Sequence, residues 1–226
     1  MPSTMSAKRP STAIALITDL DGVISDLVSE FLLRASELAG AELHAPWEVG
    51  HHDELLAPFD GCPRTVRNDA KSILLGKPAY AYISARPYFC GLLLLELWAK
   101  NCNGPIYFVS SRPPALFNDT VTWLARWVGR RGQRELDPAT VFCCGTRAKK
   151  ISTMLQIAGR YHDATILDDD PRVASGILAK SRRPHVVLIP QPWNAAGQVD
   201  QHNSLSAVLH TLGLPEDPRG DSPGWR

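Results

Sequence analysis

The chain has almost no excess charge of either sign. Its 24 lysine and arginine residues nearly balance 23 aspartate and glutamate residues, and the formal net charge is +1. A protein with so little net charge has no strong field to attract a long polynucleotide or an anionic membrane surface. The composition therefore requires no nucleic-acid partner.

Long hydrophobic runs are also absent. The longest, Gly91 to Trp98, is interrupted by Glu96, and it is far shorter than the roughly 20 residues of a membrane span. We expect it to form a buried helix. The stretch from Met1 to Thr12 contains basic residues, but two aspartates follow it in place of the apolar region of a signal peptide. We therefore expect a cytoplasmic protein with no membrane partner.

Cysteine is scarce and irregularly spaced. The five cysteines are odd in number and show no CxxC spacing: Cys62, Cys90, Cys102, Cys143 and Cys144. This pattern argues against a disulfide framework and against a zinc site. Reduced, buried thiols are expected.

What the sequence does contain is an apolar strand that ends in two aspartates. In the segment ITDLDGVISD, Asp19 and Asp21 are two positions apart and Gly22 follows them. Open parallel sheets bind ligands at the carboxyl ends of their strands. There, one carboxylate can attack phosphorus and share a Mg²⁺ ion, while the other acts as acid and base. The pair therefore predicts hydrolysis of a phosphate ester.

Strands and helices alternate along most of the chain. A strand is expected over 13–19, and apolar residues at helical spacing follow it from Ile24 to Leu38. Further helices are expected over 87–101, 115–130, 147–159 and 171–181, and strands over 105–110, 140–144, 164–168 and 185–189. This alternation predicts an α/β, Rossmann-like fold, a parallel sheet with helices on both faces.

The alternation is interrupted over residues 41–85, where histidine, proline, glycine and aromatic residues are scattered. We interpret this segment as a small cap insertion after the first strand. The predicted organisation is a flexible N-terminus (1–12), a catalytic core (13–40 and 86–211) split by the insertion, and a flexible C-terminal tail (212–226).

The segment Asp19-Leu20-Asp21-Gly22-Val23 resembles the first signature of the haloacid dehalogenase-like (HAD-like) hydrolases. That family has three further elements in fixed order, and each has a candidate here. They are a strand ending at Ser110, a lysine pair at Lys149-Lys150 that opens a helix, and a strand ending in Asp168-Asp169. Each element is weak alone, but four in the family's order are specific. The resemblance implies a HAD-like core with a cap.

The resemblance also implies roles for these residues. Asp19 is the expected nucleophile, and Asp21 the general acid and then the base. Ser110 is expected to hydrogen-bond a phosphoryl oxygen. Either Lys150 or its neighbour Lys149 should neutralise charge at the nucleophile and the phosphoryl group. The sequence slightly favours Lys150, and Lys149 then counts among the substrate-binding residues.

A metal site is implied at the same strand ends. Asp168 and Asp169 are expected to complete, with Asp19 and Asp21, a site for Mg²⁺, a hard ion that prefers oxygen ligands. The next residue, Asp170, is expected to cap the following helix instead.

Two further segments resemble the 5′(3′)-deoxyribonucleotidase-like branch of the family. They are Ser110-Ser111-Arg112-Pro113 and the PQPWN stretch that ends at Asn194. The resemblance implies that Arg112 and Asn194 lie near the phosphate, with Gly22 and Ser111 also in the substrate-binding set.

The insertion is harder to interpret. Five aromatic residues could stack on a nucleobase, or they could pack in the insertion's own core: Trp47, Phe59, Tyr80, Tyr82 and Tyr88. The run His51-His52-Asp53 favours a surface turn over a ligand set, because adjacent histidines point in different directions.

The leading hypothesis is a Mg²⁺-dependent phosphomonoesterase that acts on a small phosphorylated metabolite, with a nucleoside monophosphate as candidate. A polynucleotide 3′-end phosphatase is the alternative enzyme, and steep salt dependence would distinguish it. A catalytically silent binding or regulatory domain is the third alternative. Such a domain would lack one of the signature aspartates or the signature lysine, and all of them are present here.

Overall fold

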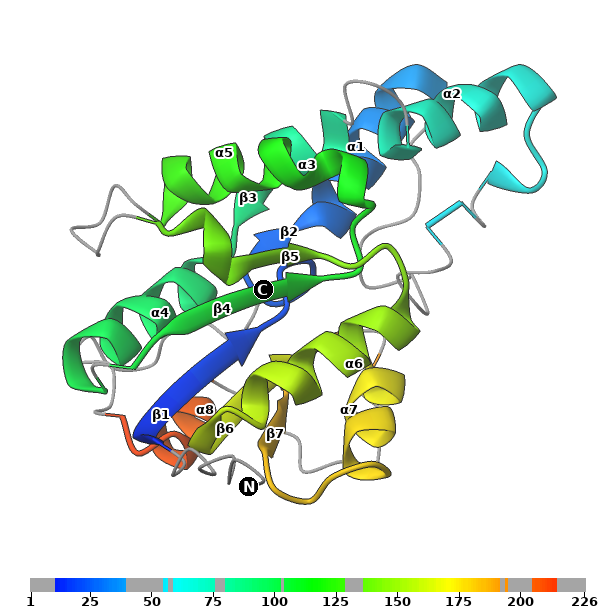
Figure 1. The fold of residues 1–226 in the computed structure, drawn as a ribbon. Helices are drawn as coiled ribbons and strands as arrows, with labels where there is room; N and C mark the ends of the chain where they lie inside the picture. Colours follow the sequence, from blue (N-terminus) through cyan, green and yellow to red (C-terminus); the bar gives the residue numbers. More distant parts are fainter. Residues whose placement is uncertain are drawn as a thin grey trace, which may run out of the picture.

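A five-stranded parallel sheet forms the centre of the protein (Figure 1). The structure, a computed structural model, describes residues 11–39, 55–56, 59–75, 80–102, 104–128, 136–191, 194 and 205–214. The strand order is β5-β4-β1-β6-β7. The strands are β1 (Ser11–Thr18), β4 (Ile106–Ser110), β5 (Val141–Cys143), β6 (Tyr161–Asp168) and β7 (His185–Leu188). The predicted α/β fold is confirmed.

Helices cover both faces of the sheet because side chains alternate along each strand. Leu16 of β1 packs in an apolar cluster with the helices on one face, and Ile17 packs with those on the other. The first face holds α4 (Phe89–Asn101), α5 (Phe117–Trp127) and α8 (Leu205–Thr211). The second holds α6 (Arg147–Ala158) and α7 (Pro171–Leu178). The apolar run from Leu92 to Leu95 is buried in α4, as predicted.

Two helices begin beside the strand ends that carry the aspartates. The hydroxyl of Thr146 accepts a hydrogen bond from the Lys149 amide at 3.3 Å and caps α6. The carboxylate of Asp170 accepts one from the Arg172 amide at 2.9 Å and caps α7, whose first residue is Pro171. The predicted cap at Asp170 is confirmed.

A second, helical unit is inserted between β1 and α4. Its two ends form a short antiparallel stem of β2 (Ser25–Asp26) and β3 (Arg86–Pro87). The Tyr88 hydroxyl reinforces the stem by donating to Asp26 Oδ1 at 3.0 Å. Between the strands lie α1 (Leu27–Ala39), α2 (Arg64–Leu75) and α3 (Tyr80–Ser84).

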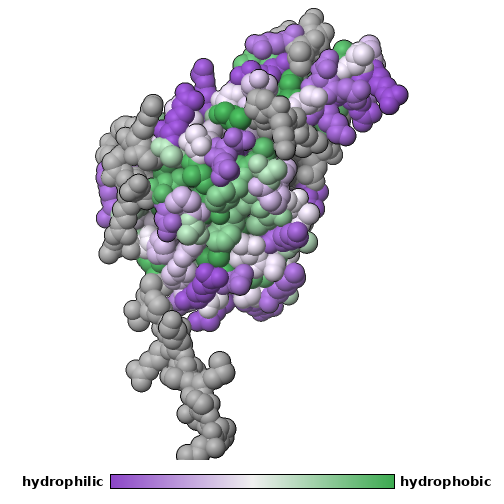
Figure 2. All heavy atoms as spheres, turned by 45° about the horizontal axis from the view of Figure 1, so that its top comes forward, coloured by the Kyte–Doolittle hydropathy of each residue, from purple (hydrophilic) through white to green (hydrophobic). Residues whose placement is uncertain are grey.

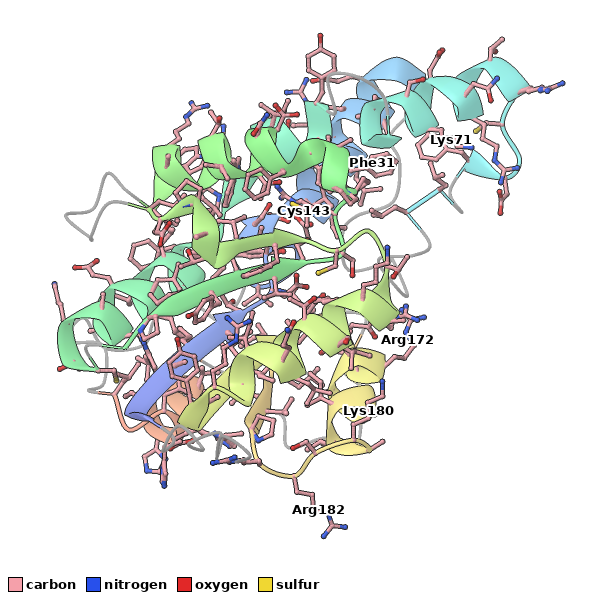
Figure 3. The ribbon with its side chains drawn as sticks, viewed as in Figure 1. Phe31, Lys71, Cys143, Arg172, Lys180 and Arg182 are labelled. Atoms are coloured by element: carbon pink, nitrogen blue, oxygen red, sulfur yellow. The ribbon has the colours of Figure 1, made fainter. Side chains whose placement is uncertain are left out.

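Helix α1 belongs to this insertion by its packing, although the sequence assigned it to the core. Phe31 of α1 meets Phe59 edge to face at 6.1 Å (Figure 3 shows Phe31 among these helices). The surrounding apolar cluster joins α1 to α2 and α3, whereas the described side chains of the two sheet clusters include none from α1. An amphipathic stripe indicates that a helix has a buried face but not which partner covers it, so the sequence could not make this distinction.

Both predicted flexible ends need correction. Strand β1 begins at Ser11, inside the segment 1–12. Helix α8 was not predicted, and Leu214, within the tail 212–226, is buried against the same cluster as Leu209. Trp47, the His51-His52-Asp53 run and residues 215–226 lie outside the described residues.

Polar residues cover much of the surface. The lobe that carries α2 is mainly hydrophilic in Figure 2, and Arg172 and Arg182 project outward in Figure 3. Among the described residues, no helix is both long and apolar enough to cross a membrane. No disulfide joins the five cysteines, all of which lie in the described part of the chain. Cys90 and Cys144 are buried, whereas Cys62, Cys102 and Cys143 are half-buried, so the expectation of buried thiols holds for two of the five.

Candidate active site

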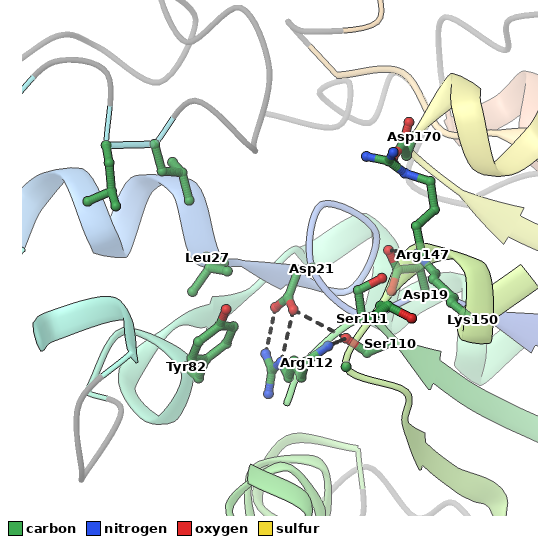
Figure 4. A pocket seen from close by; sticks show the side chains of 14 residues that line it. Asp19, Asp21, Leu27, Tyr82, Ser110, Ser111, Arg112, Arg147, Lys150 and Asp170 are labelled. Atoms are coloured by element: carbon green, nitrogen blue, oxygen red, sulfur yellow. Dashed lines mark hydrogen bonds and ion pairs between the residues drawn. The ribbon is translucent and has the colours of Figure 1, made fainter. Parts of the chain in front are cut away.

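The predicted catalytic side chains meet at the carboxyl ends of β1, β4 and β6, around a cavity of about 340 Å³ (Figure 4). β1 lies between β4 and β6. Helix α5, which follows β4, and helix α7, which follows β6, pack on opposite faces of the sheet. This is the crevice where open parallel sheets bind ligands. Asp19, Asp21, Ser110 and Lys150 all line it.

Lys150 joins two of the aspartates. Its ammonium lies 2.6 Å from Asp19 Oδ2 and 2.8 Å from Asp168 Oδ2, and all three side chains are buried. Lys149 is exposed and is not among the described residues that line the cavity. The structure therefore places Lys150, not Lys149, at the site.

A sequence signal for that choice does exist. Ile151, Met154 and Ile157 form the buried face of α6. Position 150 lies one turn before Met154 and two turns before Ile157, so it shares their face, whereas position 149 does not. Helical periodicity thus distinguishes the two lysines once the helix is known to begin after Thr146.

Asp19 is held as a buried carboxylate. Its Oδ1 accepts a hydrogen bond from the Leu20 amide at 2.7 Å, and Oδ2 meets Lys150. Burial is the main cause that raises the pKa of Asp19 to about 7; Asp168 and Asp21 raise it further, and Lys150 opposes them. Burial lowers the pKa of Lys150, but the charges of Asp168 and Asp19 outweigh this and raise it above its ordinary value. Lys150 is therefore an ammonium.

Three carboxylates form a candidate metal centre. Asp19, Asp168 and Asp169 each place an oxygen within 4.8 Å of the others, and all three are buried. An all-oxygen, anionic donor set of this kind fits Mg²⁺. Asp21, the fourth predicted ligand, is not in the group. The carboxylate of Asp21 faces Arg112 instead, and the guanidinium of Arg112 donates a hydrogen bond to each Asp21 oxygen.

Gly22 makes the close approach of two strand ends possible. Its φ is +84°, a conformation that favours glycine, and a Cβ there would lie 2.2 Å from Asp169 Oδ2. A side chain at this position would collide with the carboxylate. Gly22 is predicted to bind substrate, but the structure places it against Asp169.

Asp21 forms a two-point ion pair with Arg112. Arg112 Nη2 donates to Asp21 Oδ1 at 2.6 Å, and Nε donates to Oδ2 at 2.9 Å (dashed in Figure 4). Ser110 Oγ lies 3.5 Å from Asp21 Oδ2 and accepts a hydrogen bond from the Arg112 amide at 3.1 Å. This fork geometry holds the side chain of Asp21 in one orientation.

The Arg112 side chain is almost fully enclosed. It donates to Thr120 Oγ1 at 3.3 Å and to Ser25 Oγ at 3.4 Å, and its guanidinium lies 4.8 Å from the ring centroid of Tyr82. Arg112 also lines the cavity. The geometry therefore places the Arg112 guanidinium against Asp21, the expected acid.

Asn194 lies behind the carboxylates, not at the cavity. Its amide donates to the carbonyl oxygens of Asp169 and Ile189 at 2.8 and 2.7 Å, and the residue is buried. The expectation that it lies at the phosphate mouth is not matched by this placement. Ser111, in contrast, lines the cavity. Gln191, which lies in the same PQPWN stretch and had no predicted role, is also buried.

The cavity has one apolar and one polar wall. The insertion provides the apolar wall, formed by Leu27, Leu55, Leu56 and Tyr82. Opposite lie Thr146, Arg147 and Asp170, where Arg147 Nε donates to Asp170 Oδ2 at 2.9 Å. Burial raises the pKa of Asp170, but hydrogen bonds from Arg172 and the charges of Arg147 and Arg172 hold it well below its usual range. The sequence did not predict the polar wall, because its residues come from two segments that are distant in the chain.

Several solved structures share this fold, although no family model and no curated relative matches the chain. A haloacid dehalogenase-like family hydrolase from Streptococcus pneumoniae is similar with a TM-score of 0.60 at 15% identity, over 89% of this chain and 99% of that one. A HAD family hydrolase from Deinococcus radiodurans R1, with bound phosphate and sodium, gives 0.56 at 16% identity over 93% and 100%. The HAD-hydrolase YfnB from Bacillus subtilis, bound to magnesium, gives 0.52 at 15% identity over 90% and 100%. The chain therefore has the fold of the HAD-like hydrolases.

Proposed function

We propose that this protein is a Mg²⁺-dependent phosphomonoesterase that works through an aspartyl-phosphate. The observation that carries the proposal is the buried Lys150 ammonium, which bridges Asp19 and Asp168 beside a cavity that Asp21 and Ser110 also line. Such a preorganised set of charges can stabilise the charge that develops on a transferring phosphoryl group. The phosphate and magnesium bound by two structural neighbours support the same chemistry.

In the first half of the proposed reaction, an oxygen of Asp19 attacks phosphorus and the bond to the leaving oxygen breaks. Asp21 gives a proton to that oxygen, and the alcohol leaves. In the second half, Asp21 takes a proton from a water molecule, whose oxygen displaces Asp19 and releases inorganic phosphate. Arg112 donates to both oxygens of Asp21, and each oxygen keeps a second lone pair that can carry the transferred proton.

The proposed metal ligands are the three clustered carboxylates of Asp19, Asp168 and Asp169. Bound there, Mg²⁺ would neutralise charge on the phosphoryl oxygens. Lys150 keeps the carboxylates close to one another, and Ser110 is positioned to hydrogen-bond a phosphoryl oxygen.

The proposed substrate is a small phosphorylated metabolite. The insertion places apolar side chains over one wall of the cavity, and these would contact an uncharged, apolar or aromatic part of the substrate. A nucleoside monophosphate is the candidate that agrees with the 5′(3′)-deoxyribonucleotidase-like segments.

A phosphate-release screen over phosphorylated metabolites, with and without Mg²⁺, tests this function. We expect Mg²⁺-dependent release from a subset of small monoesters by the wild-type protein and none by an Asp19→Asn variant. Failure to release phosphate from any monoester would contradict the proposal. Release only from polynucleotide ends, with a steep decline as salt rises, would support the alternative enzyme.

Asp168→Asn is expected to weaken Mg²⁺ binding and activity together, with partial recovery at high Mg²⁺. One anionic ligand becomes neutral, and the Lys150 ammonium loses a charged partner at 2.8 Å. The measurement is a Mg²⁺ titration of activity. Half-saturation at the wild-type concentration would mean that Asp168 is not a ligand.

Mg²⁺ binding is expected to weaken as the pH falls. The pKa of Asp19 is about 7 without a metal, so at lower pH the ion must displace a proton from this ligand. Calorimetry from about pH 8 to about pH 6 should show falling affinity and increasing proton release. Constant affinity across this range would mean either that Asp19 is not a ligand or that its pKa is not raised.

Tyr82→Ala is expected to raise KM for the preferred substrate while changing kcat for a minimal aryl phosphate little, which is the pattern of lost ground-state binding. If the ring stacks on a base, the loss should be roughly 1 to 3 kcal/mol. Tyr82→Phe, which retains the ring, is the control. Unchanged kinetics for both nucleotide and non-nucleotide substrates would remove the nucleotidase proposal.

A further inference from the structure

The loop after β7 carries two buried amide side chains that the proposed chemistry does not use. Gln191 and Asn194 are 6% and 2% exposed. Neither is among the described residues that line the cavity. Buried amides of this kind need hydrogen-bond partners, and the partners identify what the loop does.

Asn194 is bonded to backbone on three sides. Its Nδ2 donates to Asp169 O at 2.8 Å and to Ile189 O at 2.7 Å, and its Oδ1 accepts from the Gln191 amide at 2.9 Å. Both hydrogens of the Asn194 amide therefore have an acceptor. The side chain ties the loop after β7 to the backbone of one carboxylate residue in the candidate metal centre.

Gln191 makes the corresponding contact to the other acidic loop. Its Nε2 donates to Gly22 O at 2.6 Å. Gly22 is the residue whose missing side chain lets Asp169 approach. The two amides thus bind the backbone on either side of the contact between the loop after β1 and the loop after β6.

We propose that Gln191 and Asn194 are positioning residues that hold these two loops in register, so that the carboxylate of Asp169 stays beside those of Asp19 and Asp168. The inference rests on the proposed function only in its requirement for a divalent cation. Ile189 N, which donates to Asp168 O at 2.8 Å, supports the same arrangement from the end of β7. Outer contacts that orient metal ligands affect metal affinity by about 10- to 100-fold.

The test compares Asn194→Ala and Gln191→Met with the wild-type protein. Methionine keeps the approximate length of glutamine but has no N–H to donate to Gly22. Leu209→Ala is the matched control, because Leu209 is fully buried. Its helix, α8, lies near the start of β1, away from the carboxyl ends of the strands (Figure 1). Leu209 makes neither of the side-chain hydrogen bonds that join the loop after β7 to Gly22 and Asp169, so this control should destabilise the fold without removing them.

Two measurements decide the outcome at a temperature where every variant is folded. Hydrogen exchange without metal should become faster over residues 19–25 and 168–173 in the two loop variants but not in Leu209→Ala. Calorimetry with Mg²⁺ alone should show about 10- to 100-fold weaker binding in Asn194→Ala, a smaller loss in Gln191→Met and none in the control.

Unchanged exchange in both segments would overturn the inference. Faster exchange with unchanged Mg²⁺ affinity would also overturn it, because the amides would then stabilise the loops without positioning a ligand. Failure of the wild-type protein to bind Mg²⁺ would overturn the proposed metal dependence separately, and the exchange data would still decide whether these amides hold the two loops.

Discussion

Asp19→Asn is expected to abolish turnover, with kcat reduced by about 10⁴-fold or more, as when an enzymatic nucleophile is removed. An amide is not a competent nucleophile, and it is not an anionic ligand for a metal. The fold should survive, because asparagine has nearly the same shape and Lys150 keeps Asp168 as a partner at 2.8 Å. The measurement is phosphate release with the substrate found in the screen.

Asp137→Asn is the control for this substitution. Asp137 accepts a hydrogen bond from the Ala139 amide at 2.9 Å and is not among the residues that line the active-site cavity. The same change there should leave kcat unaltered. Substantial activity in Asp19→Asn would contradict the aspartyl-phosphate route, while loss in both variants would point to a nonspecific effect.

The strand ends of the site could be predicted because their chemistry is local. An apolar strand followed by Asp19 and Asp21, or by Asp168 and Asp169, is visible in a few consecutive residues. Since the carboxyl ends of parallel strands share one edge of the sheet, neighbouring strands bring these side chains together.

The contacts between the loops could not be predicted in this way. Arg112 and Asp21 are 91 residues apart, and Gln191 and Gly22 are 169 residues apart. A periodic pattern along the sequence does not predict which distant loops touch. The distances between these residues are set only when the sheet and the insertion have packed. Arg112 was therefore expected near the phosphate without its ion pair to Asp21, and Gln191 lay in the recognised PQPWN stretch without a predicted partner.

The packing of α1 shows the same limit. Its apolar stripe predicted a helix and a buried face, which the structure confirms. The stripe does not show whether the sheet or the helices α2 and α3 cover the buried face of α1. The stem formed by β2 and β3 contains only two residues in each strand, too few for a strand pattern to be visible in the sequence.

The ion pair between Asp21 and Arg112 holds the expected general acid in one orientation. Asp21→Asn is expected to slow alkyl phosphates by about 10²- to 10⁴-fold, the usual contribution of a general acid. Aryl phosphates should be slowed much less in the first step, because a phenol leaves with little need of a proton. The measurement is kcat/KM for an alkyl and an aryl ester, and equal loss on both would mean that Asp21 acts mainly through folding or the metal.

Arg112→Lys separates two roles for the arginine. Lysine keeps the positive charge but lacks the fork that binds both Asp21 oxygens. If Arg112 acts by orienting Asp21, Arg112→Lys should show the same selective loss on alkyl esters, and it should add little to Asp21→Asn in the double variant. If Arg112 binds the phosphate directly, KM should rise for both esters and the two losses should multiply. The contacts at 2.6 and 2.9 Å to Asp21 favour the first result, because a guanidinium engaged at both points must release the acid before it can bind the substrate through the same N–H groups.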